Sequence, residues 1–374
     1  MKIDELIVHT VSMPLVAPFT TSFGTQTVRT ALILELHATA ADGTSLVGWG
    51  ECVAMEEPSY SSEFLAAAKL VIADHLLPLL AGDDITAETV AHRLQPVVGH
   101  RMAKAAVEMA VLDAQLRGQG VSLASYFGAV VDRVPSGVSV GIQPTTQQLL
   151  DVVGDYLDQG YVRIKLKIEP GRDIERVRAV RERFGDDVLL QVDANAAYTL
   201  VDAPLLRRLD DFNLLLIEQP LGEEDFVQHA ALARQMTTPL CLDESIISAE
   251  AAAAAITLGA AAVINIKAGR VGGYLGARRI HDLARANGIA VWCGGILETG
   301  LGRAANAALA ALPGFTLPGD ISGSDRFYAK DLTEPLVMKD GHIDVPTGPG
   351  LGVQPVPEAS AEFSIDSTSL AIAG

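Results

Sequence analysis

The chain has 374 residues, and 28 Lys and Arg residues against 46 Asp and Glu residues give it a formal net charge of −18 at pH 7. Nucleic acids and anionic membrane surfaces attract basic proteins, so we expect neither of them as a partner of so acidic a chain. This length exceeds what a single hydrophobic core usually supports, and two domains are therefore expected.

Residues 1–125 are predicted to form an α+β domain, because strand-like segments come first and helical segments follow. The strands are expected at 3–11, 30–38 and 46–53, and the helices at 62–80, 86–97 and 103–118. The first segment alternates like a strand and lacks the long apolar core of a signal peptide. No apolar stretch is long enough to span a bilayer, so we expect a cytoplasmic protein.

The character of the sequence changes after residue 125, where short apolar strands begin to alternate with turns and amphipathic helices. Seven strands are expected here, at 138–142, 162–167, 189–193, 214–217, 240–243, 263–267 and 290–293. Repeated βα units favour a closed parallel barrel over residues 126–340. Residues 341–374 open with a stretch rich in Gly and Pro, DVPTGPGLG, and are expected to leave the barrel and pack on the first domain.

A charged residue ends five successive strands of this predicted barrel, and that spacing is the strongest signal in the sequence. Neighbouring members of the series are 24 to 26 residues apart, which is one βα repeat: Lys167, Asp193, Glu218, Asp243 and Lys267. The carboxyl ends of parallel barrel strands meet at one face, where the active sites of such barrels lie. Side chains alternate along a strand, so Lys165 shares the inward face with Lys167. Buried charges of this kind must pair with each other or bind a metal ion.

Three carboxylates on adjacent strands, without His or Cys among them, favour a hard cation over zinc, either Mg²⁺ or Mn²⁺. Lys167 and Lys267 lie four strands apart, so an eight-stranded barrel places them on opposite walls. A small carboxylate substrate bound between them would have one lysine on each face of its α-carbon. This arrangement suits the removal of a proton next to a carboxylate.

The motifs KLK, DAN, EQP, DES and NIKAGRVGG together resemble those of the enolase superfamily, specifically its muconate-lactonizing-enzyme subgroup. The similarity runs over nearly the whole chain, from PFTTSFG, GWGEC and AVEMAVLDA in the first domain to PTGPGLGV near the C-terminus. It is greatest to the branch of o-succinylbenzoate synthases and N-succinylamino acid or N-acylamino acid racemases. The resemblance implies an α/β fold, a modified TIM barrel of the (β/α)7β type with an α+β capping domain.

The same resemblance implies roles for residues at matching positions of this sequence. Lys167 and Lys267 are expected to be the acid/base pair, and the expected ligands of Mg²⁺ are Asp193, Glu218 and Asp243. Three further residues are expected to support this group or to touch the substrate carboxylate: Lys165, Asn195 and Glu244. The substrate pocket is expected to be lined by Ser139, Gly295 and Ile296.

Two hypotheses concern residues outside this set. Phe19 and Phe23 lie in APFTTSFG, which we interpret as a lid that closes the barrel and contacts an apolar part of the substrate. A polar surface hairpin is the alternative. Arg270 follows Lys267 by three residues and is expected to lower the pKa of that lysine through like-charge repulsion. The alternative is a structural role at the end of its strand.

Two motifs of other superfamily enzymes are absent from the sequence, and their absence reduces the number of candidate functions. None of the eight histidines ends a barrel strand, as the His–Asp dyad of a mandelate racemase requires, and PGDISGSDRFY lacks the Asp-x-Asp of dipeptide epimerases. The resemblance therefore implies a homo-oligomeric lyase that forms o-succinylbenzoate for menaquinone biosynthesis, a racemase of N-acylamino acids, or both. The alternatives are another enzyme of the subgroup (a cycloisomerase or dipeptide epimerase), a Schiff-base aldolase that uses Lys267, and a non-catalytic binding barrel.

Overall fold

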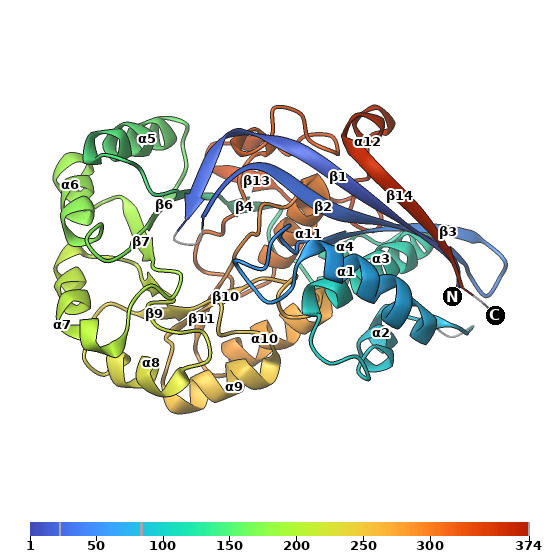
Figure 1. The fold of residues 1–374 in the computed structure, drawn as a ribbon, viewed down its shortest axis with the longest axis horizontal. Coiled ribbons are helices and arrows are strands. Elements are labelled where there is room, and N and C mark those ends of the chain that lie inside the picture. The colour runs from blue at the N-terminus through green and yellow to red at the C-terminus, as the bar shows by residue number, and fades with distance from the viewer. Residues whose placement is uncertain (22–23, 83–84, 373–374) are drawn as a thin grey trace.

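The computed structural model describes residues 1–21, 24–82 and 85–372 of the chain. Phe23, one of the two aromatic residues of the predicted lid, lies outside the described residues. The described chain forms an antiparallel sheet with its own helices beside a parallel sheet that helices surround (Figure 1). This is the α/β barrel with an α+β capping domain that the sequence predicted, and that prediction is confirmed.

Four antiparallel strands form the capping sheet in the order β14-β1-β2-β3: β1 (Lys2–Thr21), β2 (Gly24–Thr39), β3 (Ser45–Cys52) and β14 (Ser364–Ala371). The helices of this part are α1 (Leu65–Val71), η1 (Ile72–Leu76), η2 (Leu77–Leu80), α2 (Ala87–Arg93), α3 (Arg101–Gln119) and α4 (Leu123–Phe127). β1 and β2 extend well beyond the predicted strands, as a two-stranded ribbon with an irregularity between Pro14 and Phe19. The prolines there interrupt the alternation from which the strands were predicted.

Helix α3 packs so closely on β3 that two positions of the strand accept only glycine. A Cβ atom added at Gly48 would lie 2.1 Å from the carbonyl oxygen of Ala110, and one at Gly50 would lie 2.1 Å from that of Ala106. Both distances are far below van der Waals contact, so the absence of a side chain is what allows helix and sheet to approach.

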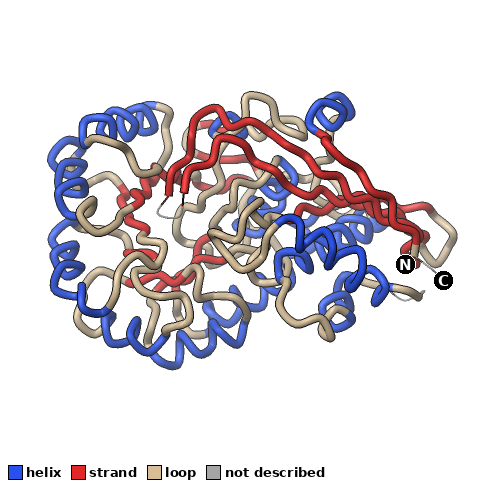
Figure 2. The backbone as a smooth tube through the Cα atoms, viewed as in Figure 1, coloured by secondary structure: helices blue, strands red, loops and turns tan. Residues whose placement is uncertain are grey.

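The barrel sheet contains seven parallel strands in sequence order: β5 (Gly137–Val140), β6 (Arg163–Lys167), β7 (Leu189–Asp193), β8 (Ile217–Glu218), β9 (Leu240–Leu242), β10 (Val263–Ile266) and β11 (Ala290–Cys293). The helices lie outside the strands (Figure 2): α5 (Thr146–Asp158), α6 (Ile174–Phe184), η3 (Leu200–Asp202), α7 (Ala203–Leu206), η4 (Arg207–Phe212), α8 (Phe226–Ala233), α9 (Ala249–Leu258), α10 (Tyr274–Ala286) and α11 (Gly300–Ala310). The observed β8 is shorter than the predicted strand 214–217, although both end at the same edge.

Residues 319 and 320 close the barrel between its first and last strands. The backbone N–H of Gly137 donates to the carbonyl of Gly319, and the N–H of Asp320 donates to the carbonyl of Cys293. Inside the barrel the ring of Trp292 lies against two cations, 5.2 Å from the guanidinium carbon of Arg163 and 4.9 Å from the ammonium of Lys165. These side chains fill the barrel interior around Trp292.

Smaller elements complete the chain. β4 (Arg133–Pro135), β12 (Met338–Lys339) and β13 (His342–Asp344) form a sheet of their own, and η5 (Ser324–Arg326) and α12 (Pro357–Phe363) lie in the C-terminal part. None of the helices in the described ranges combines the length and the apolar character that crossing a membrane requires.

Two buried carboxylates of the capping domain connect it to the barrel, because each accepts hydrogen bonds from the N-terminus of a barrel helix. Glu108 of α3 accepts hydrogen bonds from the backbone N–H groups of Tyr274 and Leu275, at 2.9 and 2.8 Å, where α10 begins. Glu51 of β3 does the same for α11 through Thr299 and Gly302, both at 2.9 Å. The first N–H groups of a helix lack intrahelical partners, so an acceptor from the other domain stabilises both the helix and the junction.

Candidate active site

Three buried carboxylates form a row across adjacent strands at the mouth of the barrel. Asp193 ends β7, Glu218 ends β8, and Asp243 follows β9; each is at most 1% exposed. Because β6 and β10 flank these three strands, Lys167 approaches the row from one side and Lys267 from the other. The five residues that the sequence predicted to meet at this face are brought together, and we call them the carboxylate row and its flanking lysines.

Each flanking lysine contacts the carboxylate nearest to it. The Nζ atom of Lys167 lies 2.6 Å from Oδ2 of Asp193, and that of Lys267 lies 2.7 Å from Oδ2 of Asp243. Lys165, on the same face of β6, bridges the row with its Nζ atom 3.1 Å from Glu218 and 3.3 Å from Asp193. These pairs satisfy charges that would otherwise be buried alone.

Amide side chains complete the network. Asn195 accepts a hydrogen bond from Lys167 at 2.7 Å and donates one to Glu244 at 2.8 Å, so it links a lysine to a fourth carboxylate. Asn265 donates to Glu218 at 2.7 Å. The second oxygen of Glu244 is buried and has no hydrogen-bond partner among the described residues. The structure thus joins Lys165, Asn195 and Glu244 to the row.

Burial and mutual repulsion shift the pKa values of these carboxyl groups. Burial, with the neighbouring carboxylates, raises the pKa of Glu218 to about 8 and the pKa values of Asp243 and Glu244 to about 7. Asp193 behaves differently: burial alone would raise its pKa, but the ammonium groups of Lys167 and Lys165 hold it below its usual range. Burial is therefore the main cause of the raised pKa values in this group, and repulsion between neighbouring carboxylates adds to it.

The carboxylate oxygens of the row are suitable ligands for a hard cation, although in this structure they contact lysine ammonium groups. No three His, Cys, Asp or Glu side chains in the described part of the chain are placed to hold a metal ion as they stand. The oxygens that face inward are instead held by ammonium groups. The donor set is all oxygen, burial and the neighbouring carboxylate of Asp193 raise the pKa of Glu218, and one Glu244 oxygen is unpartnered. A divalent cation such as Mg²⁺ would relieve each of these conditions.

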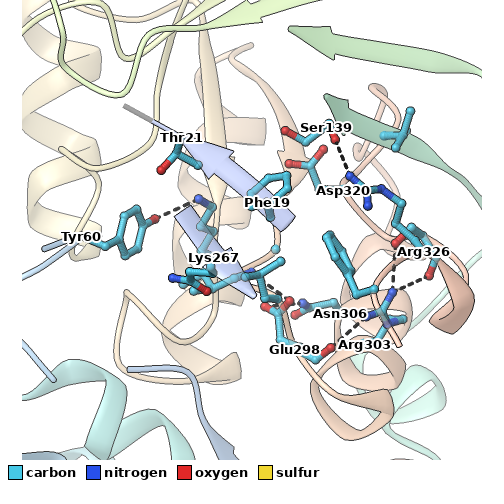
Figure 3. Close-up of a pocket in the computed structure, with 18 of the residues that line it drawn as sticks. Phe19, Thr21, Tyr60, Ser139, Lys267, Glu298, Arg303, Asn306, Asp320 and Arg326 are labelled. Carbon is cyan, nitrogen blue, oxygen red and sulfur yellow. Dashed lines mark hydrogen bonds between the residues drawn. The ribbon is translucent and has the colours of Figure 1, made fainter. Parts of the chain in front are cut away.

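A cavity beside Lys267 lies between the mouth of the barrel and the capping domain (Figure 3). Four residues predicted for the pocket or lid line it together with Lys267: Phe19, Ser139, Gly295 and Ile296. Phe19 comes from the ribbon of β1 and β2 and meets the edge of Phe327 at 5.8 Å between ring centroids. The N–H of Ile142, two residues after β5, donates to the carbonyl of Thr20, so the ribbon is attached beside the end of the first barrel strand and lines the cavity.

Arg270 contacts the carboxylate row rather than acting on Lys267 alone. Its Nη1 group donates to Oδ1 of Asp243, whose other oxygen is held by Lys267, and both cations lie over the ring of Tyr60. The expected lowering of the pKa of Lys267 is wrong for this arrangement. Burial alone would lower that pKa, but the carboxylates of Asp243, Glu244 and Glu218 raise it above its ordinary value.

Several residues at the site were not predicted from the sequence. The hydroxyl of Tyr60 accepts a hydrogen bond from Lys267 at 3.0 Å. Asp320 lies 2.6 Å from Lys165 and 2.8 Å from Arg163. Arg303 and Arg326 line the cavity far along the chain from the strand-end motifs. All of them except Arg163 and Arg303 lie in loops or short turns, where periodicity gives no signal.

The barrel, the carboxylate row and the cavity beside it define an enzyme of the enolase superfamily, and the chain belongs to that family. Residues 3–128 match the mandelate racemase / muconate lactonizing enzyme N-terminal domain, and residues 148–359 match the enolase C-terminal domain-like family. The superfamily predicted from the motifs is confirmed.

Close relatives have been named. Over 365 residues the chain is 65% identical to an N-succinylamino acid racemase of an Amycolatopsis species, an alignment that covers 97% of this chain and 98% of the relative. It is 46% identical over 354 residues to the o-succinylbenzoate synthase of Geobacillus stearothermophilus, covering 94% and 93%. A crystal structure of an enolase-superfamily member from Listeria innocua superposes with a TM-score of 0.94 at 41% identity and covers 99% of both chains.

Proposed function

We propose that this enzyme removes the proton from the carbon next to a substrate carboxylate, and that it racemises N-succinylamino acids, forms o-succinylbenzoate, or does both. The observation that carries the proposal is the position of Lys167 and Lys267 on either side of the buried carboxylate row. The names of relatives at 65% and 46% identity supply the two reactions.

Each flanking lysine is placed to hold or move a proton at its Nζ atom. A substrate carboxylate over the row would present one face of its α-carbon to Lys167 and the other to Lys267. In racemisation the neutral amine of one lysine accepts the α-proton, and the ammonium group of the other donates a proton from the opposite side. In o-succinylbenzoate formation, one lysine takes the α-proton and returns a proton to the departing hydroxyl group, which leaves as water, while the second lysine remains charged beside the developing negative charge.

We assign Asp193, Glu218 and Asp243 as the residues that hold Mg²⁺, on which members of the superfamily depend. The bound ion supplies positive charge against the negative charge that develops on the substrate carboxylate. Asn195 orients Lys167 through its 2.7 Å hydrogen bond, and Lys165 offsets the charge of Glu218 and Asp193. Phe19 and the ribbon that carries it exclude water from the cavity.

The test is an assay of the purified protein on both reactions, with Mg²⁺ and after chelation. We expect turnover of N-succinylphenylalanine between enantiomers, of the precursor of o-succinylbenzoate, or of both, lost on chelation and restored by Mg²⁺. Lys267→Ala is expected to abolish it, whereas Lys339→Ala, at an exposed lysine, serves as the matched control.

Two outcomes of this assay would contradict the proposal. One is the absence of turnover in both reactions. The other is activity that survives chelation together with trapping of a carbonyl compound on Lys267 by borohydride, because a Schiff-base aldolase needs no metal ion.

A further inference from the structure

On the side of the cavity opposite Lys267, the guanidinium group of Arg326 has no acidic partner among the described residues. Figure 3 shows Arg326 and Lys267 on opposite sides of the pocket, with Phe19 drawn between them. No Asp or Glu of the described ranges forms an ion pair with Arg326. Two acids line the same cavity: Asp320 is already held by Lys165 and Arg163, and Glu298 accepts hydrogen bonds from Ile296 and Asn306.

Aromatic rings fix the orientation of this guanidinium group. Its central carbon lies 4.6 Å from the ring centroid of Phe327, 5.0 Å from that of Tyr156 and 5.8 Å from that of Phe19. One Nη2 hydrogen bond, 3.0 Å long, goes to the backbone carbonyl of Ser139. A guanidinium stacked in this way exposes only its edge to a ligand, and the edge is what binds a carboxylate with two parallel hydrogen bonds.

Polar atoms on both sides of the Arg326–Ser139 contact are left without partners. The Nε atom of Arg326 and the Oγ atom of Ser139 are both buried, and neither has a hydrogen-bond partner among the described residues. A buried donor that stays unsatisfied costs free energy, so this corner of the cavity is built for an acceptor from a ligand.

Arg303, the other guanidinium group of the cavity, also has a buried Nε atom without a partner in the described part of the chain, but most of its remaining donors are already occupied. Its Nη1 group donates to the carbonyl and hydroxyl oxygens of Ser322 and to the carbonyl of Gly323, and its Nη2 group donates to the carbonyl of Glu298. Arg303 lies against Phe327 at 5.6 Å and adds positive charge behind that ring. Within the described ranges Arg326 donates one hydrogen bond where Arg303 donates four, so Arg326 has more of its edge available to a ligand.

We propose that Arg326 binds a second carboxylate of the substrate, the one at the far end of its acyl group. This inference rests on the proposed function, and it names the residue that recognises the acyl group of the substrate. N-succinylamino acids and o-succinylbenzoate share two anionic groups, the carboxylate at the reacting carbon and the carboxylate that ends the succinyl chain. The carboxylate row takes the first, and Arg326 takes the second. Arg326 is thereby the residue that selects a succinyl group over a neutral acyl group.

The experiment compares two acyl groups on one amino acid. The kcat/KM for racemisation of N-succinylphenylalanine is divided by that for N-acetylphenylalanine, in the wild type, in Arg326→Gln and in Arg326→Lys. For Arg326→Gln we expect kcat/KM on the succinyl substrate to fall about 30-fold or more, the loss expected when a buried charge pair is broken. The acetyl substrate is expected to change less than about twofold.

The lower kcat/KM of Arg326→Gln on the succinyl substrate is expected to come from a higher KM and not from a lower kcat, because the acyl end of the substrate does not react. Arg278→Gln is the matched control, since that arginine also lies over an aromatic ring, Phe127 at 6.0 Å, but outside the cavity. Arg326→Lys keeps the charge and loses the two-pronged edge, so its ratio is expected between those of the wild type and the Gln variant. It replaces the Gln variant if a lowered melting temperature shows that the latter does not fold.

A wild-type ratio in both Arg326 variants, or equal losses on both substrates, would overturn the inference. Failure of the proposed function is a different result, since the wild type would then turn over neither of these substrates nor the precursor of o-succinylbenzoate.

Discussion

Replacing Glu51 with alanine tests how the capping domain is held on the barrel. The carboxylate of Glu51 accepts hydrogen bonds from the N–H and hydroxyl groups of Thr299, at 2.9 and 2.8 Å, and from the N–H of Gly302 at 2.9 Å. Without it three buried donors lose their acceptor, at about 2 kcal/mol each and about 6 kcal/mol in all. Burial raises the pKa of Glu51 from 4.5 to about 7, and this cost offsets about 3 kcal/mol at pH values above the folded pKa. The expected net loss of unfolding free energy near pH 8 is about 3 kcal/mol.

The unfolding free energy lost in Glu51→Ala also depends on pH, and the direction of that dependence follows from the raised pKa of Glu51. A carboxyl group whose pKa is higher in the folded chain contributes stability that is fully present below its unfolded pKa and is lost as the pH rises through the folded value. For Glu51 that window runs from 4.5 to about 7. The alanine variant lacks this titration, so its deficit relative to the wild type is larger near pH 5 than near pH 8.

The assay is urea unfolding of both proteins at the two pH values. Glu57→Ala is the matched control, because Glu57 is an exposed carboxylate of the same segment and its loss is expected to change stability by less than about 0.5 kcal/mol. A Glu51→Ala variant within about 1 kcal/mol of the wild type at both pH values would refute the reasoning.

Two further substitutions test the packing of the capping domain and the assignment of the row. Gly50→Ala would place a Cβ atom 2.1 Å from the carbonyl oxygen of Ala106 and is expected to lower the unfolding free energy by about 3 kcal/mol or more. The control is Gly222→Ala, which has open space around it and should change the unfolding free energy little. Equal urea midpoints for the two variants would contradict this prediction. Glu218→Gln should abolish both turnover and the rise in melting temperature that Mg²⁺ induces, because one of three hard ligands is lost; a wild-type rise would show that the metal assignment is wrong.

The carboxylate row could be predicted from the sequence because each of its members occupies the same place in a repeated unit. Asp193, Glu218 and Asp243 each end or follow a strand of a parallel sheet, and strand ends of such a sheet meet by geometry alone. The flanking lysines follow from the same rule. The family motifs then supplied the roles that spacing alone does not fix.

Residues that loops bring to the site could not be predicted in this way. Tyr60 precedes α1, and Asp320 lies after the last barrel helix, so their positions depend on the path of the chain rather than on a period. Arg326 was visible only as one charge in PGDISGSDRFY. Glu51 and Glu108 did carry a signal, a charged residue inside the apolar patterns GWGEC and AVEMAVLDA, which marks a buried carboxylate in need of donors.

The most direct test of the account follows the α-proton of each enantiomer separately. N-succinyl-L-phenylalanine and N-succinyl-D-phenylalanine are incubated in D₂O with Mg²⁺ and with Lys167→Arg or Lys267→Arg, and loss of the α-proton signal is measured by NMR. Arginine keeps the positive charge but cannot accept the proton. Because the two lysines flank the carboxylate row from β6 and β10, each variant is predicted to stop exchange from one enantiomer and to retain exchange from the other. Equal exchange of both enantiomers by either variant would contradict the placement of the two lysines on opposite faces of the substrate.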